Sequence, residues 1–416
     1  MGRIIPLLSI AALLLVFDLY IYNAILSIYP KWSAKKKRTF TWIWWGYTLF
    51  LIIGIFVSIF LSIRLGIRAV LLVAFFMTFV SKFFFVPILL IDDLRRLGVW
   101  LQRKINPKKE NVAMNNPISR SDFLVKSGMT VAAIPFATLS YGIISGAYDY
   151  RVKHKTLYLP NLPKAFDGIK LGQLSDIHSG SFYNKKAVSG GVNLLLKEKP
   201  DFIFFTGDLV NNRATEMRDY QDVFSKVKAP LGVFSVLGNH DYGMYETWAT
   251  EKDRLKNLED IKQTHKLMGW DLLMNENRSL KVDGAEIGIL GIENWGAGRF
   301  PKYGKMEEAI KNTDDYPVKL LLSHDPSHWR AQILPKYPQI DAVFAGHTHG
   351  AQFGIEAGNI KWSPVQYIYD EWDGLYFEGK QQLYVNVGYG FIGYPGRVGM
   401  LPEITIFELK SAEKPV

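Results

Sequence analysis

Five short motifs in the second half of the chain combine histidine with carboxylate or amide side chains. In chain order they are Asp176-Ile177-His178, Gly207-Asp208, Gly238-Asn239-His240-Asp241, Ser323-His324-Asp325-Pro326 and Gly346-His347-Thr348-His349-Gly350. They hold five of the eight histidines, and the chain has no cysteine, so thiolate ligands are excluded. Carboxylates, imidazoles and an amide together suit borderline divalent cations such as manganese, iron or zinc. The motifs therefore predict a metal centre.

The spacing within two motifs supports one shared site. Asp176 and His178, like His347 and His349, are two residues apart. At a turn from a strand into a loop, such a pair can converge on one ion. We expect the three histidines outside the motifs to be structural; these are His154, His265 and His328.

The elements that must position these motifs form an α/β pattern from about Lys155 onward. Predicted strands cover residues 169–174, 201–205, 233–237, 286–290, 319–322, 342–345, 383–387 and 403–408. Predicted helices cover residues 185–197, 216–227, 245–267 and 306–312. Each motif follows a predicted strand, and loops at strand ends converge on one crevice in α/β sheets.

The first third of the chain predicts a membrane region. A spanning helix needs roughly 20 apolar residues, and stretches of that order cover residues 4–28, 39–63, 69–91 and 127–147. The first carries Asp18 and the third carries Lys82, which we interpret as helix-packing or snorkelling residues rather than functional ones. We predict a four-helix transmembrane region in residues 1–150 and a catalytic domain in residues 155–416.

Basic residues predict the orientation, because cytoplasmic loops near span ends are rich in Lys and Arg. The first loop carries Lys31, Lys35, Lys36, Lys37 and Arg38, and the third carries Arg95, Arg96, Arg103, Lys104, Lys108, Lys109, Arg120 and Lys126. The opposite side has only Arg3, Arg64 and Arg68. Both chain ends, and with them the catalytic domain, are expected outside the cytoplasm of a plasma (inner) membrane. The net charge of +10 thus indicates topology and not nucleic-acid binding.

From about Lys155 to the end, the motifs and their order resemble the calcineurin-like metallophosphoesterase family. Residues 291–295, 323–329 and 393–404 are similar to its membrane-anchored bacterial branch. The resemblance implies a two-sheet α/β/β/α sandwich. It also implies that Asp176, His178 and His349 bind one metal ion, that Asp208 bridges, and that Asn239, His324 and His347 bind the second. His240 would stand beside the phosphate, with Asp241 orienting its imidazole.

Two cations about 4 Å apart can hold phosphate oxygens, neutralise charge developing at phosphorus and activate a bridging water. Asp208 suits the bridge because a carboxylate has two oxygens, whereas an imidazole offers one lone pair. The expected reaction is hydrolysis of a phosphate ester or pyrophosphate bond. Membrane attachment favours a lipid or lipid-linked phosphate as substrate, although a soluble phosphoester stays open.

Two rival functions follow from the same residues. One is a pyrophosphatase like those acting on UDP-diacylglucosamine in lipid A synthesis, which needs a site facing the cytoplasm. The other is a receptor or scaffold that keeps the metal site without turnover. The complete ligand set together with His240 argues against the scaffold, and an assay on phosphomonoesters and phosphodiesters separates the two.

Two further segments have alternative interpretations. Residues 356–377 are rich in aromatic side chains and form either a rim that meets the bilayer or a lipid, or a loop folded over the domain's own core. Residues 390–397 either close over the site with Arg397 on a phosphate or form a structural turn.

Overall fold

The computed structural model describes residues 4–61, 65–105, 119–296, 298, 300–358 and 360–412. Within the chain lie two compact units, Met1–Tyr141 and Gly142–Val416, called unit 1 and unit 2 below. The predicted domain limits at residues 150 and 155 stay a prediction. Several residues used above for the spans and the orientation lie outside the described ranges; they are Arg3, Ile63, Arg64, Lys108 and Lys109.

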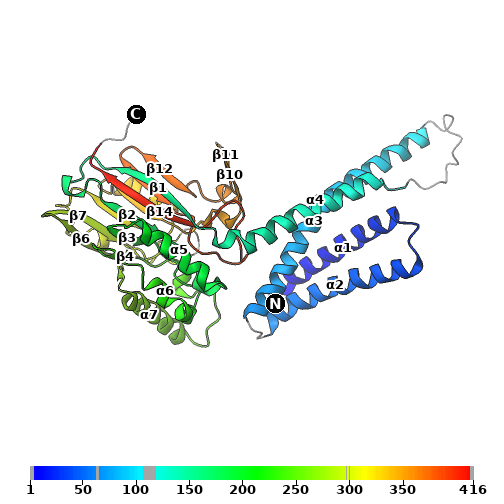
Figure 1. The fold of residues 1–416 in the computed structure, drawn as a ribbon, viewed down its shortest axis with the longest axis horizontal. Helices are drawn as coiled ribbons and strands as arrows, with labels where there is room; N and C mark the ends of the chain where they lie inside the picture. Colours follow the sequence, from blue (N-terminus) through cyan, green and yellow to red (C-terminus); the bar gives the residue numbers. More distant parts are fainter. Residues whose placement is uncertain are drawn as a thin grey trace. The chain divides into compact units, whose positions relative to one another are not determined.

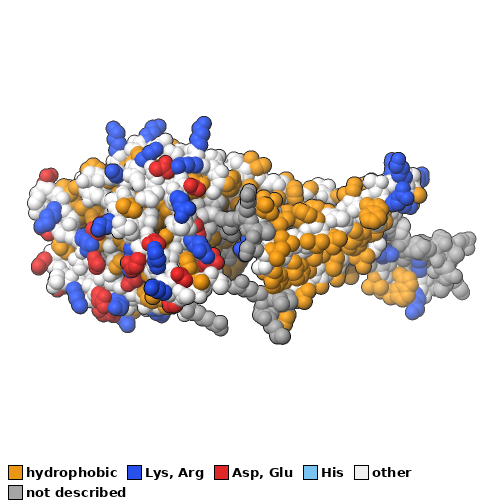
Figure 2. All heavy atoms as spheres, turned by 90° about the horizontal axis from the view of Figure 1, so that it is seen from below, with side chains coloured by type: hydrophobic (Ala, Val, Ile, Leu, Met, Phe, Trp, Pro, Cys, Tyr) orange, Lys and Arg blue, Asp and Glu red, His pale blue; other side chains and the backbone are white. Residues whose placement is uncertain are grey.

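Four long apolar helices supply the membrane-spanning candidates of the described residues. They are α1 (Ile4–Ile28), α2 (Ala34–Phe60), α3 (Leu65–Ile105) and α4 (Asp122–Ile144). Each is long and apolar enough to cross a bilayer. Hydrophobic side chains cover most of the visible surface of these helices, with Lys and Arg gathered at one end, whereas charged side chains of both signs are spread over unit 2 (Figure 2). The predicted four-helix region is confirmed, although α3 continues well beyond its predicted end at residue 91.

The two charged residues inside the spans form an ion pair with each other. Nζ of Lys82 on α3 lies 2.5 Å from Oδ1 of Asp18 on α1, and Asp18 is fully buried. Lys82 also lies over the ring of Trp44 on α2. Intramembrane charges usually pair in this way, so their role in helix packing agrees with the prediction.

Unit 2 is built on two six-stranded mixed sheets (Figure 1). In spatial order, the first consists of β1 (Arg151–Tyr158), β14 (Glu403–Lys410), β2 (Lys170–Leu174), β3 (Phe202–Phe205), β4 (Val233–Ser235) and β5 (Asp271–Leu272). The second consists of β12 (Gly374–Glu378), β13 (Gln381–Val385), β9 (Ala342–Ala345), β8 (Lys319–Leu322), β7 (Ala285–Gly291) and β6 (Glu276–Val282). A separate hairpin pairs β10 (Ile355–Ala357) with β11 (Ile360–Trp362).

Alternating side chains of β3 show how the layers are held together. Phe202 and Phe204 belong to a buried cluster with residues of the second sheet, such as Phe344. Ile203 and Phe205 point the other way and pack with helix residues. The helices on that side are α5 (Lys185–Lys197), α6 (Gln221–Phe224) and α7 (Glu251–Met268), which Figure 1 shows together.

The outer face of the second sheet is covered in the same manner. Its residues Leu321 and Val343 form a cluster with Met306 of α8 (Met306–Ala309) and with Leu334 of α9 (Leu334–Lys336). The order is therefore helices, sheet, sheet, helices. The predicted α/β/β/α sandwich is confirmed.

Three of the four predicted helices differ from the observed ones in their bounds. The expected helix from residue 245 begins only at Glu251, because Thr250 and Asp253 form a reciprocal capping box at that point. The expected helix at 216–227 is a 3-10 turn, Ala214–Asp219, followed by the short α6. These differences in helix bounds do not change the position of any metal motif at the end of its strand.

Candidate metal centre

The five motifs follow five strands, three in the first sheet and two in the second. Asp176 and His178 follow β2, Asp208 follows β3, and the Asn239-His240 pair follows β4. In the second sheet, His324 follows β8, and the His347–His349 turn follows β9. The backbone amide of His347 donates to both carboxylate oxygens of Asp176, at 3.1 and 3.0 Å. Turns from opposite sheets thus meet directly.

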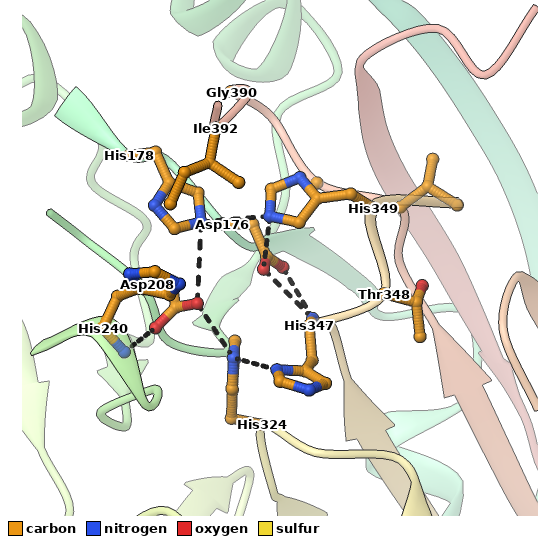
Figure 3. Close-up of polar contacts among 12 residues, drawn as sticks. Asp176, His178, Asp208, His240, His324, His347, Thr348, His349, Gly390 and Ile392 are labelled. Carbon is orange, nitrogen blue, oxygen red and sulfur yellow. Dashed lines mark hydrogen bonds and ion pairs between the residues drawn. The ribbon is translucent and has the colours of Figure 1, made fainter. Parts of the chain in front are cut away.

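The first of two ligand groups contains Asp176, His178 and His349, all buried (Figure 3). Their ligand atoms lie within 4.8 Å of one another. Nε2 of His349 is 3.0 Å from Nε2 of His178 and 3.2 Å from Oδ1 of Asp176. Three ligand atoms therefore face one small volume, as binding of a cation requires.

The second group contains Asp208, His324 and His347, whose ligand atoms meet the same 4.8 Å limit. Nδ1 of His347 is 3.2 Å from Nε2 of His324. Oδ2 of Asp208 lies 3.1 Å from Nε2 of His324 and 3.6 Å from Nε2 of His178 in the first group. One carboxylate oxygen of Asp208 therefore faces a ligand nitrogen of each group.

One buried polar atom near the groups fits a metal centre. Oδ1 of Asn239 is buried and has no hydrogen-bond partner among the described residues. Nδ2 of Asn239 donates to the Tyr245 hydroxyl at 2.9 Å, which turns the amide so that its oxygen is the orphan. A buried acceptor without a partner costs about 1–3 kcal/mol, and a cation would satisfy it. Asn239 as a ligand stays a prediction.

The backbone is strained at the candidate ligands. Positive φ values occur at Asp176 (52°), His178 (49°), Asp208 (59°), His347 (74°) and His349 (52°). Such left-handed conformations are uncommon for non-glycine residues and cost on the order of 1–3 kcal/mol each, and they concentrate at functional sites. The strain indicates that the backbone holds these side chains in position for metal binding, and that this arrangement lowers local stability.

The charges of the site are mutually dependent. Burial opposes ionisation of Asp208, but the facing His324 imidazole holds the pKa of that carboxyl well below its usual range. Burial likewise opposes a charge on His324, yet Asp208 raises the pKa of this imidazole to about 10. Burial lowers the pKa of His178, so its imidazole is neutral. A cation that binds here must displace the proton of His324.

The prediction that Asp241 orients His240 is wrong. The Asp241 carboxylate accepts four backbone N–H groups, from Asp208, Leu209, Val210 and Gly238, at 2.8 to 3.2 Å. The His240 imidazole instead places Nδ1 2.8 Å from the carbonyl oxygen of Asn211. Asp241 therefore shapes the loops that carry Asp208 and Asn239. Its two carboxylate oxygens bind four backbone amides, whereas a contact with the His240 imidazole would use only one of these oxygens.

The interpretation of Arg397 as a phosphate ligand is also wrong. Its side chain is fully buried. The guanidinium donates to the carbonyls of Val387, Gly390, His349 and Met400, at 2.7 to 3.3 Å. These four backbone carbonyls hold the guanidinium inside the domain, and residues 390–397 form a structural turn that supports the first ligand group.

Two tyrosines that no motif predicted contact candidate ligands. The Tyr369 hydroxyl lies 2.8 Å from Nε2 of His347, and Tyr245 binds Asn239 as described and lies against the ring of His240. For Tyr369 the available signal was the aromatic composition of residues 356–377, whereas Tyr245 lies outside that segment. The remaining histidines lie outside both groups: His265 binds Ser235, His328 binds Ser323, and His154 binds Glu198.

Comparisons with known proteins agree with this geometry. A model of the calcineurin-like phosphoesterase domain matches residues 169–351, and a model described as a probable calcineurin-like phosphoesterase, transmembrane domain, matches residues 2–147. The metallophosphoesterase YkuE of Bacillus subtilis is 32% identical over 292 residues, which cover 66% of this chain and 95% of that protein. The chain belongs to the calcineurin-like metallophosphoesterase family. The predicted family is confirmed.

Two further relatives are similar to this chain. A transmembrane protein with metallophosphoesterase domain from Danio rerio is 29% identical, and the match covers 65% of this chain and 60% of that protein. The phosphodiesterase YaeI of Escherichia coli is 25% identical, with 70% and 99% covered. The protein is therefore a membrane-bound hydrolase of phosphate esters, and its two His/Asp groups are candidates for the divalent metals that the family uses.

Proposed function

We propose that the two ligand groups form one dinuclear centre that hydrolyses a phosphodiester presented at the membrane. The observation that carries this proposal is the position of Asp208, whose Oδ2 faces His178 of one group and His324 of the other. Asp176, His178 and His349 would hold one ion and Asn239, His324 and His347 the other, with Asp208 between them. When bound, manganese, iron or zinc would supply charge neutralisation and an activated water.

His240 is the residue we assign to proton transfer or to support of the phosphate. The Asn211 carbonyl can only accept a hydrogen bond, so Nδ1 of His240 carries a proton. Nε2 is then the atom that can exchange a proton with a phosphate oxygen or a leaving group. The backbone amide of His240 donates to Oδ1 of Asp208 at 2.8 Å, which ties this residue to the proposed bridge.

The substrate class rests on the membrane attachment and on one relative. A chain with four candidate spans is confined to a bilayer, so phospholipids and lipid-linked sugar phosphates are the substrates within constant reach. The Escherichia coli relative is named a phosphodiesterase, which favours diesters over monoesters. The basic first and third loops support an orientation with unit 2 outside the cytoplasm.

The decisive experiment measures turnover and metal content on the same sample of full-length protein in detergent. Phosphomonoesters, phosphodiesters and pyrophosphates are tested with manganese, iron and zinc in turn. We expect diester hydrolysis and two ions per chain, and Asp208→Asn should lose activity and metal together. Undiminished hydrolysis by Asp208→Asn, or one ion per chain in the active wild type, would refute the dinuclear assignment.

A reporter fused to the C-terminus tests the orientation separately. Activity of a periplasmic reporter is the expected result. A reporter that is active only in the cytoplasm would reverse the proposed orientation and would favour a nucleotide-linked acyl sugar of the lipid A type as substrate.

A further inference from the structure

The hairpin of β10 and β11 has one apolar face and one charged face. In its antiparallel register, Ile355 lies opposite Trp362, Ala357 opposite Ile360, and Glu356 opposite Lys361. Residues directly opposite each other share a face, and faces alternate along each strand. Ile355, Ala357, Ile360 and Trp362 therefore share one face, whereas Glu356 and Lys361 share the other.

The charged face of this hairpin is turned toward the body of unit 2. Nζ of Lys361 lies 2.8 Å from Oδ2 of Asp373 and donates to the Asp373 carbonyl at 2.8 Å. Asp373 is buried, with 4% of its surface exposed. The apolar face points outward as a result, and Ile355 and Ile360 are 53% and 64% exposed. This is the reverse of the usual arrangement, in which a hairpin turns its apolar face inward.

Neighbouring side chains extend this apolar surface. Phe353 is 40% exposed and packs edge-on against Trp362. Tyr367 and Ile368, on the turn that follows β11, are each 76% exposed. We call Phe353, Ile355, Ile360, Tyr367 and Ile368 the hairpin surface. Contiguous exposed apolar residues of this kind mark an interaction site.

The base of the hairpin is linked to the end of a candidate membrane span through residues 397 and 398. The amide of Gly354 donates to the Val398 carbonyl at 2.9 Å, and the amide of Arg397 donates to the Gly142 carbonyl at 3.2 Å. Gly142 lies in the last turn of α4, inside the candidate span Asp122–Tyr148. A side chain at Gly142 would collide with Val398, since its Cβ would lie 2.6 Å from Cγ2. The base of the hairpin is therefore close in space to the residues that end this candidate span.

The dimensions and composition of the hairpin suit a membrane interface. A three-residue strand reaches about 10 Å, and the polar layer on each side of the hydrocarbon core is roughly 5–8 Å thick. Isoleucine supplies apolar area, and Tyr and Trp are enriched at the level of lipid headgroups. From these observations, we propose that the hairpin surface inserts into the lipid bilayer beside the end of α4.

Insertion of the hairpin surface does not depend on the reaction that the metal centre performs. Within residues 356–377, Trp372 belongs to a buried cluster with Val365 and Met400, whereas the hairpin's apolar face, Tyr367 and Ile368 face outward. The segment is thus part core and part membrane contact.

Site-specific fluorescence quenching tests the proposal, and the absence of native cysteine makes the labelling specific. A fluorophore is attached to Ile360→Cys, Ile368→Cys or Leu267→Cys in the full-length protein. Leu267, on α7, is 60% exposed and thus matches Ile360 as a control. The proteins are reconstituted into vesicles of phosphatidylcholine and phosphatidylglycerol that contain lipids with a nitroxide near the headgroup end of the acyl chain.

We expect strong quenching at positions 360 and 368 and only background quenching at 267. Background quenching at all three positions overturns the proposal. A cross-linked dimer through Cys at position 360, without quenching by lipid, also overturns it and assigns the hairpin surface to a second copy of the chain. The readout does not require activity, so a failure here is distinguishable from a failure of the proposed reaction.

Discussion

Nη2 of Arg397 lies 3.2 Å from Nδ1 of His349, and both side chains are buried. Nη1 of the same guanidinium donates to the backbone carbonyl of His349 at 3.3 Å. The same guanidinium donates to the carbonyls of Val387 and Gly390. Arg397 thereby links the orientation of a candidate ligand to the path of the C-terminal segment.

Replacing Arg397 with lysine should weaken the first metal position. An ammonium group cannot reproduce the planar fork that reaches several carbonyls at once, and residues behind metal ligands typically contribute 10–100-fold to metal affinity. We expect manganese affinity of Arg397→Lys to fall by about tenfold or more, and the unfolding temperature to fall as well. Arg151→Lys, at a side chain that is 57% exposed, is the control and should change neither value.

Removing the Tyr369 hydroxyl should weaken the second metal position. This hydroxyl lies 2.8 Å from Nε2 of His347, whose Nδ1 faces the second group. Tyr369→Phe loses the partner that holds the ring in this orientation, so we expect about a tenfold loss of affinity for one ion out of two. Metal titration by calorimetry measures the loss. Tyr367→Phe, at a side chain that is 76% exposed, should bind both ions normally, and equal losses in the two variants would contradict the prediction.

Gly346→Ala should abolish metal binding. A Cβ at this position would lie 1.9 Å from Oγ of Ser175 and 2.2 Å from Oδ2 of Asp176, so the Asp176 carboxylate must move. The matched control is Gly190→Ala in α5, where a Cβ has no neighbour within 4 Å. This control should keep its metal and gain up to about 1 kcal/mol of stability, because alanine is the better helix former. Normal metal content in Gly346→Ala would show that the turn can adapt.

His265 should make the fold less stable in acid. Burial lowers the pKa of its imidazole from 6.5 to about 3, so the folded protein keeps it neutral. Below pH 6.5 the unfolded chain takes up a proton that the folded chain refuses, and stability falls by up to about 1.4 kcal/mol per pH unit until the folded pKa is reached.

Denaturant unfolding at pH 7 and pH 5 measures this effect in the detergent-solubilised protein. Between pH 7 and pH 5, His265 alone should lower the free energy of unfolding of the wild type by about 2 kcal/mol. The decrease in His265→Gln should therefore be smaller by about 2 kcal/mol. His154→Gln, at a side chain that is 62% exposed, should follow the wild type. An unchanged pH dependence in His265→Gln would mean that the buried imidazole can be charged at little cost.

The metal motifs and the strands before them were predictable because both depend on local patterns, whereas the two-sheet sandwich was predicted only through the resemblance to a family. Apolar runs such as Leu320–Leu322 and Val343–Ala345 read as buried strands, and each ends next to a histidine motif. Strands with mixed composition were missed. β1 contains Lys153 and His154 because it is an edge strand that pairs only with β14 in its sheet, so one of its edges and much of its surface meet solvent.

Contacts between distant segments were beyond the reach of sequence patterns. Asp241 stands next to His240 in the chain, yet its carboxylate binds the amides that follow Gly207, since the β3 and β4 loops lie side by side. Arg397 and His349 are 48 residues apart and meet only through the packing of the turn that follows β13. Neither relationship leaves a periodic signal.

Each ligand group draws residues from both sheets: β2 and β9 carry the first group, and β3, β8 and β9 carry the second. A bound ion would therefore act as a cross-link between the two halves of the sandwich. If the chain were cut between Met274 and Lys319, one fragment would carry the metal loops of the first sheet and the other those of the second. Each fragment would then hold an incomplete set of ligands for both ions. Metal uptake would therefore report on the reassembly of the two fragments. Metal binding and the pairing of the two sheets would thus depend on each other.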